Sequence, residues 1–228
     1  MSVKLTAFPT RDALMAAAAE YLADALQHAL DARGEACAAL SGGSTPEPAY
    51  ALLAGRDLDW ARVTFALVDE RFVPPSHEAS NERMLRRALA PALANGARLL
   101  PMYAPTADAR SAAAHADALY APLTIDVALM GMGEDGHTAS WFPGAGELGE
   151  ALAPETRATV ISVHAPQAAG SAARLTLTYA ALNATPRMLL LITGAGKRAL
   201  IESAAFSATP AASLFRRSAG PPQLMWAP

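Results

Sequence analysis

Residues 125–138 read IDVALMGMGEDGHT and carry the clearest fold signal in the chain. Ile125–Met130 is a mostly apolar run without the alternation of a half-exposed strand, which is typical of a strand buried on both faces. The glycine-rich turn at 131–138 follows directly, and open α/β sheets bind ligands just beyond the carboxyl ends of their strands. The stretch therefore predicts an interior strand of a parallel sheet with a functional loop after it.

Three more apolar runs have the same form, a buried-type strand followed by a loop of small or charged residues. They are Ala36–Leu40 before SGGST (41–45), Val63–Val68 before DER (69–71), and Met188–Thr193, which ends in TGAGK (193–197). Because the carboxyl ends of parallel strands lie at one edge of a sheet, we expect the four loops to gather there.

Helical patterns alternate with these strands. Thr10 can cap a long helix whose leucines recur every four residues and which Gly34 ends. Other helices are expected after Pro46, after Ser80, over 107–121 and from Gly194 to about Phe206, and weaker strands at 3–8, 160–163 and 175–178. The alternation predicts an α/β fold with a parallel sheet covered by helices.

The composition excludes several classes of protein. Of 228 residues, 52% are hydrophobic and 17% charged, so the chain can bury a core and disorder is not expected. The net charge of −3 argues against a nucleic-acid-binding surface, and the single cysteine, Cys37, excludes a disulfide framework and a cysteine-based zinc site. The first residues lack the apolar core of a signal peptide, and no apolar run approaches the ~20 residues of a membrane span. We expect a cytoplasmic protein that binds neither nucleic acid nor membrane.

The four loops together predict a site for a small phosphorylated or carboxylated compound. Their small residues let a ligand approach the backbone, and helix N-termini offer free N–H groups to an anion. Arg71 and Lys197 add positive charge. Lys197 opposes the dipole at the start of its predicted helix, and a bound anion would explain this unfavourable placement. The alternatives are an ion pair of Arg71 with Glu70 or Glu82 and a solvated Lys197. Asp69 and Glu70 are either a carboxylate pair for acid–base chemistry or two structural acceptors.

Three familiar motifs do not fit these loops. The glycines of the 131–136 turn satisfy G-x-G-x-x-G, but Pro143 and the glycines after it end the long helix that a dinucleotide site needs. A Walker A loop requires Gly-Lys-Ser/Thr, which neither SGGSTP nor TGAGKR supplies. In SGGST, Thr45 stands where a nucleophile elbow has its second glycine.

His137 is the strongest candidate for catalysis among the five histidines. It lies in the glycine-rich turn after a buried strand, and Asp135 is close enough in sequence to orient its ring or raise its basicity. The others carry weaker signals: His28 and His115 fall inside predicted helices, His77 lies in a polar loop, and His164 follows a strand.

Six blocks of the sequence resemble the 6-phosphogluconolactonases. They are LSGGSTP (40–46), VDERFVP (68–74), SNERML (80–85), MGMGEDGHTASWFPG (130–144), RLTLT (174–178) and TGAGKRAL (193–200), in the family's order. The resemblance implies a single domain over residues 1–228 with a Rossmann-like, mostly parallel sheet flanked by helices, a fold shared with glucosamine-6-phosphate deaminases. It implies hydrolysis of 6-phosphoglucono-δ-lactone to 6-phosphogluconate, the second step of the oxidative pentose phosphate pathway. It also implies no metal and no organic cofactor, and we expect a monomer whose partner is the small sugar-phosphate lactone.

The resemblance also implies roles for particular residues. His137 matches the proposed general base, which Asp135 supports, and Arg71 and Lys197 match the residues that hold the phosphate. Further residues that would line the site or assist binding are Gly42, Gly43, Ser44, Thr45, Asn81 and Arg174. In the implied reaction, neutral His137 removes a proton from the water that attacks the lactone carbonyl, and backbone N–H groups of 131–137 are candidate oxyanion donors.

Two other functions are weighed against this one. Amino-sugar phosphate deaminases share the fold, but Phe142 replaces their catalytic glutamate and Arg71 replaces the tyrosine of their Asp-Glu-Tyr block. A sugar-phosphate sensor domain would bind without turnover, and such domains are usually joined to a helix-turn-helix. We expect no room for that module before the first strand, and the presence of both Asp135 and His137 favours an enzyme.

Overall fold

The computed structural model describes residues 4–228, and its centre is a parallel sheet. Within these residues the sheet has seven strands in the order β1-β10-β9-β6-β2-β3-β5, and every neighbouring pair is parallel. The strands are β1 (Leu5–Ala7), β2 (Ala36–Leu40), β3 (Val63–Leu67), β5 (Arg98–Leu99), β6 (Val127–Met130), β9 (Arg187–Thr193) and β10 (Gln223–Ala227). The four strands inferred from apolar runs are adjacent in this order, which confirms the α/β prediction.

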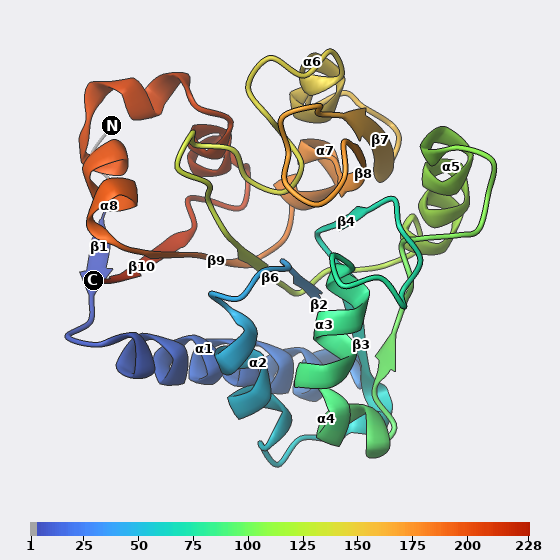
Figure 1. Cartoon of the computed structure of the whole chain (residues 1–228). Helices are drawn as coiled ribbons and strands as arrows, with labels where there is room; N and C mark the ends of the chain where they lie inside the picture. The colour runs from blue at the N-terminus through green and yellow to red at the C-terminus, as the bar shows by residue number, and fades with distance from the viewer. Residues whose placement is uncertain (1–3) are drawn as a thin grey trace.

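Helices cover both faces of the sheet (Figure 1). The helices of the described residues are α1 (Arg11–Arg33), α2 (Glu47–Ala54), α3 (Asn81–Ala88), α4 (Ala90–Ala94), α5 (Ala109–Tyr120), α6 (Leu148–Leu152), α7 (Tyr179–Asn183) and α8 (Ala195–Glu202). Figure 1 shows α1 and α2 below the sheet, with α6, α7 and α8 above it. Within the described range 4–228, no helix combines the length and the apolarity needed to cross a bilayer.

The long first helix confirms its sequence signals. The Thr10 side chain accepts a hydrogen bond from the backbone N–H of Ala13, and Gly34 ends the helix in the left-handed region at φ 77°. Leu22 and Leu26 on its inner face are completely buried, and α1 packs across four strands of the sheet. Helix α1 thus covers one face of the parallel sheet, and the second sheet lies on the other side (Figure 1).

A second, antiparallel sheet stands above the first and corrects one sequence interpretation. Residues 69–71 were expected to be a loop, but they form β4 (Asp69–Arg71), which pairs with β8 (Ala173–Leu177), and β8 pairs with β7 (Val160–His164). The physical reason is burial, because the side chains of Asp69 and Glu70 are enclosed although their type suggests exposure. The weaker strands expected near 160 and 175 are present, and both belong to this sheet.

One helix boundary and two strands also differ from the sequence prediction. The helix expected to reach Phe206 ends at Glu202, because Ser203 is extended, and a 3₁₀ segment follows at Ala204–Ala208. Strands β5 and β10 were not anticipated. Strand β5 has only two residues, and β10 follows two prolines near the end of the chain, so neither shows a long apolar run.

Candidate active site

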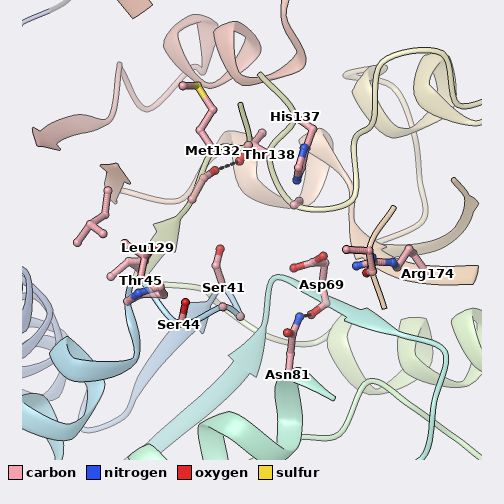
Figure 2. A pocket seen from close by; sticks show the side chains of 18 of the residues that line it. Ser41, Ser44, Thr45, Asp69, Asn81, Leu129, Met132, His137, Thr138 and Arg174 are labelled. Atoms are coloured by element: carbon pink, nitrogen blue, oxygen red, sulfur yellow. Dashed lines mark hydrogen bonds between the residues drawn. The ribbon is translucent and has the colours of Figure 1, made fainter. Parts of the chain in front are cut away.

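A cavity of about 340 Å³ opens at the carboxyl edge of the parallel sheet (Figure 2). The loops after β2, β6 and β9 meet there, and β4 closes one side, as the strand-end argument predicted. Nine of the ten candidate site residues line it: Gly42, Gly43, Ser44, Thr45, Arg71, Asn81, His137, Arg174 and Lys197. The tenth, Asp135, lies behind His137 and lines a neighbouring cavity.

The loop after β2 is held close to helix α3. A Cβ at Gly42 would lie 1.9 Å from Oδ1 of Asn81, so only glycine permits this approach. Gly43 has φ 101°, a conformation that side chains rarely adopt. Asn81 in turn donates from Nδ2 to the backbone oxygen of Asp69 at 2.8 Å. The amide of Asn81 therefore fastens α3 to β4, and the same side chain lies against the first loop and lines the cavity.

Glu70 is a structural acceptor. Its carboxylate accepts hydrogen bonds from the backbone N–H groups of Arg71, Asn81 and Glu82 and from the Ser80 hydroxyl, at 2.7–3.0 Å. Burial raises the pKa of Glu70, and the four hydrogen bonds oppose that rise. The carboxylate sits at the N-terminus of α3, where negative charge is favourable. Glu70 thus fixes α3 against β4 and takes no place in the cavity wall.

Asp69 differs from its neighbour because it faces the cavity. Its Oδ2 accepts a hydrogen bond from the Ser140 hydroxyl at 2.7 Å, and its side chain is part of the cavity wall. In Figure 2, Asp69 lies above Asn81, with Arg174 to its right. Asp69 can accept hydrogen bonds from a ligand, and the alternative of a paired carboxylate with Glu70 is not supported, since Glu70 points into α3.

His137 and Asp135 form the closest pair of titratable groups at the site. Nδ1 of His137 lies 2.6 Å from Oδ1 of Asp135, which also accepts the backbone N–H of His137 at 3.1 Å. Burial raises the pKa of Asp135, but these hydrogen bonds and the charge of the ring outweigh it, so the pKa lies below its ordinary value. An ionised carboxylate only accepts, so Nδ1 of neutral His137 carries the hydrogen and Nε2 keeps its lone pair.

Aromatic packing connects His137 to Arg174. The rings of His137 and Phe142 have centroids 4.3 Å apart, and the Arg174 guanidinium lies 5.6 Å from the Phe142 centroid. Arg174 also donates to the backbone oxygens of Ser171 and Ala169. Burial lowers the pKa of Arg174. Two of its three nitrogens therefore hold the 165–172 loop against the cavity.

The two expected phosphate-binding cations lie in the cavity wall, and neither pairs with a carboxylate among residues 4–228. Arg71 donates from Nη1 to the backbone oxygen of Ala79 at 2.5 Å, and its Nε is buried with no partner. Within residues 4–228 no ion pair joins Arg71 to Glu70 or to Glu82, so that alternative is wrong. Glu82 pairs with Arg86 at 2.7 Å. Lys197 lies in the first turn of α8 and forms no ion pair within residues 4–228.

Three of the backbone N–H groups expected to hold an oxyanion are used inside the 131–138 turn. Those of Gly133 and Gly136 donate to the backbone oxygens of His137 and Gly133, at 2.9 and 3.1 Å, and that of His137 donates to Asp135. This corrects the expectation for these three groups. Ser41, Met132 and Thr138 line the cavity from the predicted loops, whereas sequence reasoning missed Leu129, Ala139, Ala169 and Leu191, whose types carry no signal.

A comparison with known protein families shows to which family the chain belongs. The profile described as glucosamine-6-phosphate isomerases/6-phosphogluconolactonase matches residues 9–226. The chain belongs to this family. The 6-phosphogluconolactonase of Rhizobium meliloti (strain 1021) is 42% identical over 234 residues, covering 100% of both chains. That of Caulobacter vibrioides is 37% identical, covering 99% of this chain and 97% of that protein.

Solved structures of the same family have the same fold. A 6-phosphogluconolactonase from Shewanella baltica aligns with a TM-score of 0.92 at 32% identity, covering 100% of this chain and 98% of that chain. A monomeric glucosamine-6-phosphate deaminase aligns with a TM-score of 0.77 at 20% identity, covering 99% and 97%. The prediction of a Rossmann-like fold is therefore confirmed.

Phe142 is the residue that, by the resemblance, replaces the catalytic glutamate of the deaminases. In the structure its ring packs against His137, with the ring centroids 4.3 Å apart. Asp135 is the carboxylate that His137 contacts instead. Within residues 4–228, no group of three or more His, Cys, Asp and Glu side chains could hold a metal ion.

Proposed function

We propose that this family member hydrolyses 6-phosphoglucono-δ-lactone to 6-phosphogluconate in the oxidative pentose phosphate pathway, with His137 as the general base. The observation that carries the proposal is the 2.6 Å contact between His137 Nδ1 and Asp135 Oδ1 beside a cavity lined by Arg71 and Lys197. Relatives up to 42% identical over the full chain bear the name 6-phosphogluconolactonase. A cytoplasmic location and a monomeric state stay predictions.

The phosphate is held at the basic side of the cavity. Arg71 and Lys197 come from β4 and from the first turn of α8, so an anion between them has positive groups on two sides. The N-terminus of α8 has no side-chain cap, and its partial positive charge adds to the attraction. Binding there fixes the position of the lactone carbonyl relative to His137.

His137 then moves one proton twice. Nε2 takes a proton from water as the water oxygen bonds to the lactone carbonyl carbon, and Asp135 stabilises the imidazolium. When the tetrahedral carbon releases the ring oxygen, the imidazolium returns the proton to that oxygen, and the products are a carboxylic acid and a hydroxyl group. A positioned general base contributes about 10²–10⁴ in rate.

The remaining cavity wall recognises the sugar hydroxyl groups. Ser44 and Thr45 present hydroxyls on one side, and Asp69 presents a carboxylate on another. Gly42 and Gly43 keep the backbone of the first loop accessible. This mixture of donors and acceptors suits a polyhydroxylated ligand.

The test is the decay of freshly generated lactone, with the spontaneous rate subtracted. Glucose 6-phosphate, NADP and the dehydrogenase that oxidises it supply the substrate. We expect rapid decay with the wild type, loss of most turnover in His137→Ala, and a raised KM in Arg71→Ala. His28→Ala is the matched control, because His28 is exposed on α1 away from the cavity.

Three outcomes would contradict the proposal. Decay that never exceeds the spontaneous rate would exclude lactone hydrolysis, and glucosamine 6-phosphate would then be assayed for deamination. Unchanged kinetics in His137→Ala would remove the general base while leaving the activity. Binding of 6-phosphogluconate without turnover would point to a sensor.

A further inference from the structure

The imidazole of His137 rests directly on the backbone of Gly133. A Cβ built on Gly133 would lie 2.2 Å from both Nδ1 and Cε1 of His137 and 2.7 Å from Oδ1 of Asp135. Contacts below 3.0 Å do not occur at real Cβ atoms. Any side chain at residue 133 would therefore displace the edge of the ring that contacts Asp135.

The backbone itself gives no reason for glycine at this position. Gly133 is not among the glycines with positive φ, whereas Gly136 in the same turn has φ 78°. Alanine could adopt the backbone conformation of residue 133 without left-handed strain. The ring and the carboxylate beside it are what exclude a side chain.

The turn holds the ring and the glycine together. The N–H of Gly133 donates to the backbone oxygen of His137 at 2.9 Å, which brings residue 137 back over residue 133. Phe142 stands against the ring with a centroid distance of 4.3 Å, and Phe142 is packed under Arg174. The ring is therefore in contact with Phe142 as well as with Gly133.

We propose that Gly133 is a positioning residue for the catalytic imidazole, an inference that rests on the function proposed above. The absent side chain lets Nδ1 reach Asp135, which sets the tautomer and points Nε2 at the attacking water. In Gly133→Ala the ring must move by about 1 Å or more to restore an ordinary contact, and a misplacement of that size costs about 10²-fold in rate.

The experiment compares four proteins in the lactone assay: wild type, Gly133→Ala, His137→Ala and the double variant. We expect Gly133→Ala to lower kcat by about 10²-fold with KM changed by less than about threefold. Gly146→Ala is the matched control, because a Cβ there meets nothing within 4 Å and its φ is not positive. The control should keep the wild-type kcat.

The double variant distinguishes positioning from a general structural role. If Gly133 acts through His137, adding Gly133→Ala to His137→Ala leaves the residual rate unchanged, since the displaced ring is gone. If Gly133→Ala alone does not fold, the double variant should still melt at the temperature of His137→Ala, because its main clash has been removed. A double variant that also fails to fold would overturn the proposal.

Other results also overturn it. A wild-type kcat in Gly133→Ala would show that the ring tolerates a side chain, and a raised KM with unchanged kcat would assign Gly133 to substrate binding. Either result beside an inactive His137→Ala contradicts only the role of Gly133. An active His137→Ala contradicts the general base itself.

Discussion

Arg71 and Arg174 lie directly opposite each other across the antiparallel strands β4 and β8. Two cations in opposed positions destabilise a strand pair unless an anion lies between or beside them. Burial lowers the pKa of Arg174, and the charge of Arg71 lowers it further, while Asp69 opposes the shift. The second sheet therefore brings together two positive charges that a phosphate ester would neutralise.

Inorganic phosphate should stabilise the wild-type protein. At ten times its Kd, a ligand that binds only the folded state adds about 1.4 kcal/mol, which corresponds to about 4 °C in Tm for a chain of this size. We expect Arg71→Met to lose most of this shift in a thermal melt. Sodium chloride at matched ionic strength is the control, and an equal shift with chloride would reduce the effect to charge screening.

Glu70→Gln should destabilise the fold. The amide places an NH₂ group among four hydrogen-bond donors, so at least one buried donor loses its acceptor. We expect a loss of about 2–3 kcal/mol in the free energy of unfolding, measured by urea denaturation. Glu78→Gln, at an exposed position in the loop before α3, should change stability by less than about 0.5 kcal/mol. Equal stability of the two variants would contradict the capping role of Glu70.

The pH dependence of stability follows from the same carboxyl group. Burial raises the folded-state pKa of Glu70 above its unfolded value, so the folded protein holds this proton more tightly. Between the two pKa values the contribution of Glu70 to stability decreases as the pH rises. Glu70 therefore contributes a gain in stability on acidification, opposite in sign to that of Asp135, whose folded pKa is lowered.

The parallel core could be predicted because its signals are local. Ile125–Met130 and Ala36–Leu40 are apolar on both faces, and Gly34 and Thr10 mark the ends of α1. The loops at the carboxyl ends of those strands then had to share one edge, which is why nine candidate residues line the same cavity.

The second sheet could not be predicted, because its pairing is not local. Strand β4 has three residues, all charged, and it is a strand only because β8 lies beside it, about a hundred residues away in sequence. The approach of Ala169 to the cavity likewise depends on Arg174, which holds the loop by its carbonyl groups. No pattern within the loop itself carries that information.

Lys197→Ala should weaken substrate binding more than chemistry. Lys197 lines the cavity at the start of α8, and its charge attracts the phosphate in the ground state and the transition state alike. We expect KM to rise by at least about 10-fold with kcat nearly unchanged, the pattern of uniform binding. Arg198→Ala is the neighbouring control, since Arg198 pairs with Glu202 and packs on Trp226 outside the cavity. A fall in kcat at constant KM would instead place Lys197 at the reacting atoms.

Asp135→Asn should keep the fold and lose turnover. An asparagine can turn its NH₂ group toward Nδ1 of His137, which moves the hydrogen to Nε2 and removes the lone pair that accepts the proton from water. We expect kcat to fall by about 10²-fold or more, with the Kd of 6-phosphogluconate unchanged in calorimetry.

Because the folded-state pKa of Asp135 is lowered, its stabilising contribution is complete above about pH 4 and is lost only as the pH falls through the folded value. Since Asp135 is ionised in the wild type at neutral pH, the Asp135→Asn variant should be inactive across the neutral range. The control Glu155→Gln changes an exposed loop carboxylate and should behave as the wild type. An Asp135→Asn protein with full kcat at neutral pH would show that the 2.6 Å contact does not govern the tautomer of His137.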